Sequence, residues 1–191
     1  MKNIIVLILV FCFSCQNEYT PKPQAKLRLE YPKPSYEIAK TSLPFTFEKN
    51  KLATKLETKK LPNVEASYAI DVSYPSLKGT IYLTYKGIAN SEEKLIRYLQ
   101  DAQNFTQKHT QKADEISERP FINKEKKVYG MFYEVGGNAA SQSQFYVTDS
   151  TNHFLTGSLY FYTKPNYDSI LPAANYLQKD IQRIMETVEW Q

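Results

Sequence analysis

Alternating apolar and polar residues predict a β-hairpin in the segment from residue 67 to residue 85. A period of two places every second side chain on the same face of a strand. A turn containing Pro75 and Gly79 divides the segment, so the pattern predicts two antiparallel strands with one buried face. The apolar positions are Tyr68, Ile70, Val72 and Tyr74 before the turn and Ile81, Leu83 and Tyr85 after it.

Three more strands are predicted in the second half of the chain, over residues 128–135, 143–148 and 153–162. A Gly-Gly-Asn segment separates the first two, and an Asp-Ser-Thr-Asn segment separates the last two, so short turns favour an antiparallel meander. The first of these strands is apolar on both faces, so we expect part of the sheet to be covered on both sides. Residues 44–47 are the clearest extended segment nearer the N-terminus, and residues 27–31 alternate as a first strand would.

A change to helical spacing after residue 90 predicts an amphipathic helix over residues 90–108. Asn90, with Glu93 three residues later, is a plausible N-cap. The pattern can continue through Ala113 and Ile116 and would end before Pro120. The apolar positions are Leu95, Tyr98, Leu99, Ala102 and Phe105.

A second amphipathic helix is predicted near the C-terminus, with one narrow apolar stripe. Asp168 can cap it, and Pro172 is tolerable in its first turn because N–H groups there have no helical partner. The stripe consists of Ile170, Ala174, Leu177, Ile181, Ile184 and Val188.

The order of these elements predicts an α+β fold, an antiparallel β-sheet of about five to seven strands with two main amphipathic helices packed on it. Residues 36–191 are long enough for one such domain. The chain has 15 Tyr and 10 Phe among 191 residues, so aromatic side chains should fill much of the core.

The first fifteen residues resemble a bacterial lipoprotein signal. Lys2 is followed by an apolar run, Ile4 to Phe13, that is too short for a span of about 20 residues. Ser14 precedes Cys15 where a lipobox places cleavage and lipidation, whereas Cys12 follows the bulky Phe11. We therefore expect residues 1–14 to be removed and Cys15 to carry acyl chains such as palmitate. The alternatives are an ordinary cleaved secretory signal or a hydrophobic N-terminus without that role.

Residues 15–35 are rich in Pro and Lys and predict an extended tether between the lipid and the domain. The only other cysteine is Cys12, so a chain processed before Cys15 has no disulfide and no free thiol. A net charge of +4 without a basic stripe gives no reason to expect nucleic acid.

Residues that could support catalysis are few. Asp149, Ser150 and His153 are the residue types of a nucleophilic triad, but a polar turn that bonds its own backbone explains them better. Neither histidine, His109 or His153, has a partner at metal-ligand spacing, so no metal and no cofactor is expected. The aromatic residues Phe154 and Tyr160 to Tyr162 could form a stacking platform, although a sheet core is the simpler interpretation. We therefore expect a non-enzymatic protein.

Seven segments spread along the chain carry motifs that resemble one family. They are Tyr19-Thr20-Pro21-Lys22-Pro23, Pro44-Phe45-Thr46-Phe47, Gly79 to Lys86, Lys112-Ala113-Asp114, Val128-Tyr129-Gly130, Gln144 to Leu155, and Pro165-Asn166-x-Asp168-Ser169-Ile170. With these motifs the chain is similar, over nearly its full length, to the gliding motility lipoproteins GldD of Bacteroidetes.

The resemblance implies a cell-envelope lipoprotein required for gliding motility and the associated type IX secretion machinery. Its partners would be other envelope proteins of those systems, and its anchor the N-terminal lipid. The family has no known reaction, so Thr148, Asp149, Ser150, Thr151 and His153 are a candidate interaction or structural motif. Gln16 after the lipidated cysteine favours the periplasmic face of the outer membrane, with the inner membrane as the alternative. A different hypothesis is a periplasmic peptide- or glycan-binding module that uses an aromatic sheet face.

Overall fold

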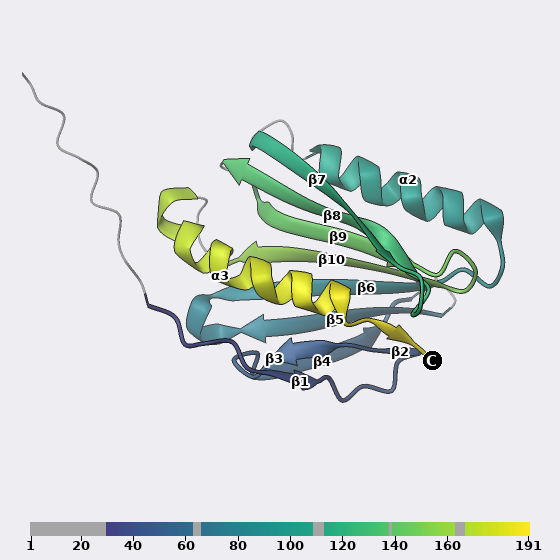
Figure 1. Ribbon diagram of the computed structural model, residues 1–191, viewed down its shortest axis with the longest axis horizontal. Coiled ribbons are helices and arrows are strands. Elements are labelled where there is room, and N and C mark those ends of the chain that lie inside the picture. The colour runs from purple at the N-terminus through teal and green to yellow at the C-terminus, as the bar shows by residue number, and fades with distance from the viewer. Residues whose placement is uncertain (1–29, 63–65, 109–112, 138, 163–166) are drawn as a thin grey trace, which may run out of the picture.

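The computed structural model describes residues 30–191 except 63–65, 109–112, 138 and 163–166 (Figure 1). The predicted signal peptide, the lipidation residue Cys15, most of the tether and the alternating residues 27–29 lie outside the described residues. Within the described part of the chain, no helix is both long and apolar enough to cross a membrane.

A seven-stranded antiparallel sheet is the centre of the fold, with the strand order β4-β5-β6-β10-β9-β8-β7 (Figure 1). The predicted hairpin is β5 and β6, and the predicted meander is β8, β9 and β10, so the α+β prediction is confirmed. Pairing of β6 with β10 joins the two groups. The strands are β4 (Lys55–Lys60), β5 (Ser67–Tyr74), β6 (Gly79–Gly87), β7 (Ala113–Asn123), β8 (Val128–Gly137), β9 (Ser141–Thr148) and β10 (His153–Phe161).

Two short sheets lie beside the large one. One pairs β1 (Tyr36–Ile38) with β3 (Glu48–Asn50), and the other pairs β2 (Phe45–Thr46) with β11 (Glu189–Trp190). The second pairing brings the extended segment predicted at residues 44–47 next to the C-terminus. Within the β5–β6 hairpin, the turn is a single 3-10 turn, η1 (Pro75–Leu77).

Helix α3 (Tyr167–Glu186) covers one face of the sheet with the predicted apolar stripe from Ile170 to Ile184. Val188, the last predicted position of the stripe, lies beyond the helix, although it is buried in the same core. Leu177, Ile181 and Ile184 are fully buried against residues of β5, β6, β9 and β10. The helix begins at Tyr167, so Pro172 lies inside it rather than in its first turn, and the expectation for Pro172 was wrong. Its missing N–H costs one helical hydrogen bond, which the buried stripe offsets.

Helix α2 (Glu92–Lys108) begins one residue later than the proposed cap requires. Ser91 caps it, because its Oγ accepts the Lys94 backbone N–H at 3.3 Å. Asn90 has a positive φ of 57° and precedes the cap, so its assignment as N-cap was wrong. Both residue types are good caps, and the sequence pattern could not choose between neighbours.

The predicted continuation of α2 through Ala113 and Ile116 was also wrong, since both residues belong to β7. Pairing along β8 outweighs the local helical spacing, because strand formation depends on cross-strand neighbours. Pro120, which was expected to end a helix, lies in β7. Its missing N–H is tolerated because β7 is an edge strand.

Helices α2 and α3 pack on opposite faces of the sheet. On β10, Phe154 contacts the α2 cluster, whereas its neighbour Leu155 belongs to the α3 core. The same alternation on β9 separates Tyr146 from Val147. The expectation that part of the sheet is covered on both sides is therefore confirmed.

The beginning of the described chain is attached to α3. The ring of Tyr31 lies 5.0 Å from that of Tyr176, whose hydroxyl donates to the Pro32 carbonyl at 2.9 Å. These two N-terminal residues fall in the segment predicted as tether, so the end of that segment contacts the domain. The boundary at residue 36 stays a prediction.

A buried polar cluster strengthens the same attachment. Asp180 of α3 is almost fully buried and accepts hydrogen bonds from the Tyr36 hydroxyl at 2.9 Å and from Asn50 Nδ2 at 3.0 Å. Burial raises the pKa of Asp180, which these hydrogen bonds partly counteract. Strands β1 and β3 are thus fixed to α3 by polar contacts as well as by apolar packing.

Candidate functional site

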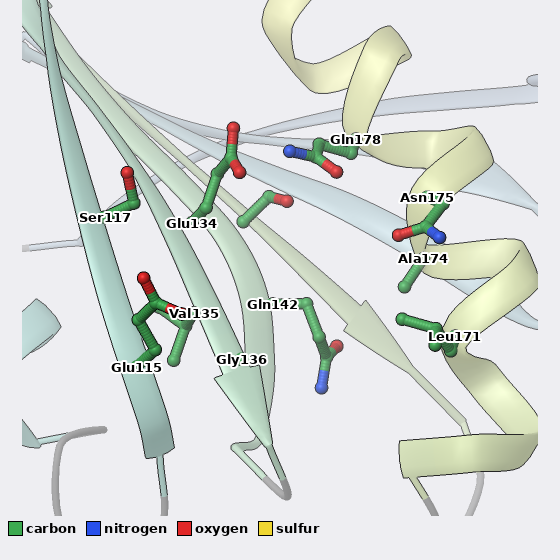
Figure 2. A pocket seen from close by; sticks show the side chains of 11 residues that line it. Glu115, Ser117, Glu134, Val135, Gly136, Gln142, Leu171, Ala174, Asn175 and Gln178 are labelled. Carbon is green, nitrogen blue, oxygen red and sulfur yellow. The ribbon is translucent and has the colours of Figure 1, made fainter.

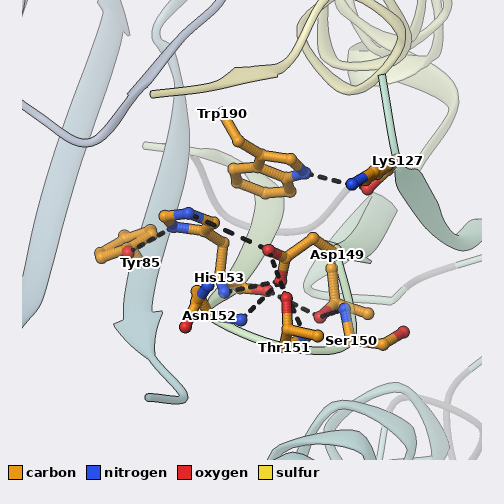
Figure 3. Close-up of polar contacts among 9 residues, drawn as sticks. Tyr85, Lys127, Asp149, Ser150, Thr151, Asn152, His153 and Trp190 are labelled. Atoms are coloured by element: carbon orange, nitrogen blue, oxygen red, sulfur yellow. Dashed lines mark hydrogen bonds and ion pairs between the residues drawn. The ribbon is translucent and has the colours of Figure 1, made fainter. Parts of the chain in front are cut away.

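The predicted motif at residues 148–153 forms the turn between β9 and β10 (Figure 3). Asp149 organises this turn. Its Oδ1 accepts hydrogen bonds from three successive backbone N–H groups, those of residues 151–153, at 2.8–3.0 Å. Thr148 links the two ends of the turn, because its Oγ1 donates to the His153 carbonyl at 2.6 Å and accepts the Ser150 N–H at 2.9 Å.

The same turn holds the connection between β6 and α2. The carbonyls of Thr151 and Asn152 accept the backbone N–H groups of Asn90 and Ile88 at 2.7 and 2.8 Å. These contacts position the start of α2 above the sheet. The polar side chains of the motif thus fold their own turn, and its carbonyls attach a neighbouring segment.

His153 joins the turn to an aromatic group on the α3 side of the sheet. Its Nδ1 lies 2.8 Å from the Tyr85 hydroxyl, and its Nε2 lies 4.0 Å from Asp149 Oδ2. The ring stacks on Trp190 with centroids 5.0 Å apart and planes at 7°. Trp190 Nε1 donates to the Lys127 carbonyl at 3.1 Å, so the indole is fixed at both ends (Figure 3).

The electrostatics of this site follow from partial burial. Burial alone would raise the pKa of Asp149, but the hydrogen bonds from its own turn together lower it below the usual value of 3.8. Burial lowers the pKa of His153 below 6.5, against the opposing effect of Asp149. Burial also raises the pKa of Tyr85 to about 12. At neutral pH the group is therefore an anionic Asp149, a neutral His153 and a protonated Tyr85.

Ser150 does not complete a nucleophilic triad with these residues. Its side chain is exposed, its φ is 67°, and Figure 3 shows it directed away from the His153 ring. The Nδ1 atom of His153 faces Tyr85 instead. The geometry supports the polar-turn interpretation of these residues.

The stacking of Trp190 on His153 could not be predicted from the sequence. It lies next to the last residue of the chain and far from His153 in sequence, and its contact depends on the pairing of β11 with β2. Tyr85 was predicted only as a buried hairpin residue. Neither residue carries a local pattern that indicates the stack.

A polar cleft opens between α3 and strands β7, β8 and β9, with a volume of about 320 Å³ (Figure 2). Glu115, Glu134 and Gln142 line the strand side, and Asn175 and Gln178 line the helix side. Glu134 is paired with Arg119, outside the cleft lining. The Oε1 atom of Gln142 is buried and has no hydrogen-bond partner among the described residues.

A second cavity, of about 270 Å³, lies on the opposite face, between α2 and strands β6, β8, β9 and β10. Its lining is mainly aromatic and hydroxyl-bearing. The predicted aromatic run divides here, since Phe154 and Tyr160 line the cavity and Phe161 packs in the α3 core. Tyr162 is 65 % exposed, so the core interpretation was wrong for that residue.

The described residues contain no group of three or more His, Cys, Asp or Glu arranged to hold an ion. The described residues that line the two cavities include no Cys and no His, the ligands that a transition metal prefers.

The fold and the site define a class of α+β domain in which one helix covers each face of an antiparallel sheet. A polar turn between β9 and β10 holds the segment that leads into one of those helices. The chain belongs to the gliding motility lipoprotein GldD family, whose family model matches residues 16–190. Its family membership therefore classifies it as a gliding motility lipoprotein. No curated protein and no solved structure matches the chain.

Proposed function

We propose that this protein is a lipid-anchored accessory of the type IX secretion and gliding machinery and that it acts through protein contacts. The observation that carries the proposal is the family match, which extends over residues 16–190 and so includes all described residues except Gln191. The Ser150–His153 geometry supports contact rather than catalysis, because neither side chain is placed to activate the other.

The motif at residues 148–153 has a structural role in this proposal. Its hydrogen bonds are made within the turn and to the β6–α2 connection, and they leave Thr151 and Asn152 exposed. The partners are other envelope proteins of the motility and secretion systems. The lipid on Cys15 concentrates the domain at the membrane where those partners lie, on the periplasmic face of the outer membrane.

A deletion with complementation in the native host tests this proposal. We expect deletion of the gene to abolish spreading on agar and export of type IX cargo, and the unmodified gene to restore both. Cys15→Ala should fail to restore them and should release the protein from the membrane fraction. Cys12→Ala is the matched control, because it removes the competing cysteine and should behave as the unmodified chain.

Crosslinking in living cells identifies the partner directly. A photoreactive residue at exposed Asn152 should capture a component of the motility or secretion machinery. Normal spreading and export in the deletion strain would contradict the proposal, as would full function of a Cys15→Ala chain that is no longer membrane-bound.

A further inference from the structure

The cavity on the α2 face combines aromatic walls with hydroxyl groups. Two aromatic pairs lie in its lining. At one end Phe154 is buried, and Tyr146 stacks on it with centroids 5.8 Å apart and planes at 6°. At the other end Tyr82 and Tyr160 meet edge to face at 5.8 Å. The strand positions between them carry Thr84, Thr156 and Ser158.

One atom of a buried amide in this cavity lacks a hydrogen-bond partner among the described residues. Gln144 lines the cavity, is 2 % exposed, and its Nε2 has no hydrogen bond among the described residues. Its Oε1 lies 3.0 Å from the Thr106 hydroxyl. If the oxygen and nitrogen of the amide are exchanged, the nitrogen faces the Thr106 hydroxyl and the oxygen is the atom without a hydrogen-bond partner. Because an unpaired buried polar group is unfavourable, a bound group that can donate or accept a hydrogen bond would complete the arrangement. A hydroxyl group can do both.

The charges of the described lining residues argue against an ionic ligand. Lys86 and Asp101 are the two charged residues among them, and they pair with each other at 3.8 Å. Burial raises the pKa of Tyr133 to about 12, so this phenol is a neutral hydrogen-bonding group at neutral pH. A phosphate or carboxylate would find no uncompensated cation among the described residues of the lining.

The strand order, the Gln144 amide and the volume distinguish between three classes of neutral ligand: a peptide, an acyl chain and a small ring compound. Strands β6, β10 and β9 are internal to the sheet, so they offer no free edge to which a peptide backbone could add. An acyl chain would leave the Gln144 amide buried and unpaired. The volume of about 270 Å³ is just below the range of about 300–1,000 Å³ for small-molecule pockets, so the cavity suits a ligand of one or two small rings.

We propose that this cavity binds a neutral saccharide, with its pyranose rings against Tyr146 at one end and Tyr160 at the other and a sugar hydroxyl on the Gln144 amide. The flat C–H faces of a pyranose match aromatic rings, and its hydroxyls match the Thr and Ser side chains between them. The ligand class is independent of the motility role.

Binding of defined saccharides to the purified protein tests the proposal. The full processed lipoprotein is extracted in a detergent without a sugar headgroup. It is titrated by calorimetry with a panel of neutral disaccharides of glucose, galactose and N-acetylglucosamine. A pool of neutral tripeptides forms the second arm. We expect at least one disaccharide to bind and the peptides not to bind.

Two variants locate the site. Gln144→Met removes the amide at nearly constant volume, and Tyr160→Ala removes a ring that is only partly buried. Each should weaken saccharide binding about tenfold or more, the size expected from a lost hydrogen bond or ring contact. Tyr129→Ala is the matched control, because Tyr129 lies on β8 outside the cavity lining, and it should bind as the unmodified chain.

Thermal unfolding of every variant verifies that it is folded before binding is compared. Absence of binding by any disaccharide overturns the proposal, and so does binding that survives both Gln144→Met and Tyr160→Ala in folded protein. Binding of the tripeptides alone also overturns it, in favour of a peptide site.

Discussion

The two faces of the central sheet are covered very differently. On the α3 face, the helix together with β1, β2 and β3 encloses a continuous core from Ala39 to Val188. On the α2 face, the buried apolar cluster of the described residues consists of Ile88, Tyr98 and Phe154, and beside it lies the aromatic cavity. The α3 face therefore carries the stability of the fold. The α2 face has room for a ligand because less of its surface is used for packing.

The largest expected difference between the faces is in the free energy of unfolding that is lost when one leucine on each helix is replaced by alanine. Leu177 of α3 is 0 % exposed, so Leu177→Ala should lower the free energy of unfolding by about 2–5 kcal/mol through lost burial and a cavity. Leu99 of α2 is only partly buried, so Leu99→Ala should cost about 1 kcal/mol. Urea unfolding monitored by circular dichroism measures both. Equal losses would show that the two faces contribute alike.

A glycine pair sharpens the comparison within the sheet. At Gly157 of β10, an added Cβ would lie 2.1 Å from the ring of buried Phe145, so Gly157→Ala should cost about 1–3 kcal/mol. Gly136 of β8 is the matched control, because a Cβ there meets its nearest atom only at 3.7 Å. Gly136→Ala should be neutral or slightly stabilising in the same denaturation experiment. A Gly157→Ala protein as stable as the unmodified chain would mean that Phe145 moves freely.

The elements that sequence predicted well are those with a long apolar period. The β5–β6 hairpin and the apolar stripe of α3 were both foreseen, because a buried face requires a strict repeat. The identity of β7 was missed, since Ala113 and Ile116 fit a helical period and only the pairing with β8 makes them a strand. The same holds for the site. Asp149 was foreseen as a turn former from its residue type, whereas the stack of His153 on Trp190 depends on long-range packing.

The turn between β9 and β10 joins the two faces, and its loss should have an intermediate effect. Asp149→Ala removes the acceptor of three backbone N–H groups. Because Thr151 and Asn152 are exposed, water can replace part of these bonds, and the expected loss of stability is about 1–2 kcal/mol. Hydrogen exchange should also accelerate at Ile88 and Asn90, which bond to the turn.

The control for this turn is Asp101→Ala, which removes an exposed carboxylate on α2 with one long ion pair to Lys86. It should change stability by less than about 0.5 kcal/mol. Unchanged exchange at Ile88 and Asn90 in Asp149→Ala would show that the β6–α2 connection is held without the turn.

The smallest expected effect is a pH dependence carried by His153 on the α3 side. Its pKa in the folded protein lies below the 6.5 of the unfolded chain, because it is partly buried. As the pH falls through the window below 6.5, the unfolded chain takes up a proton that the folded protein does not. Stability therefore falls with pH in this window. Urea midpoints measured at pH 7.5 and pH 5.5 should differ less in His153→Gln than in the unmodified chain. His109→Gln accounts for the second histidine, and a pH response equal in His153→Gln and the unmodified chain would contradict a neutral, buried imidazole stacked on Trp190.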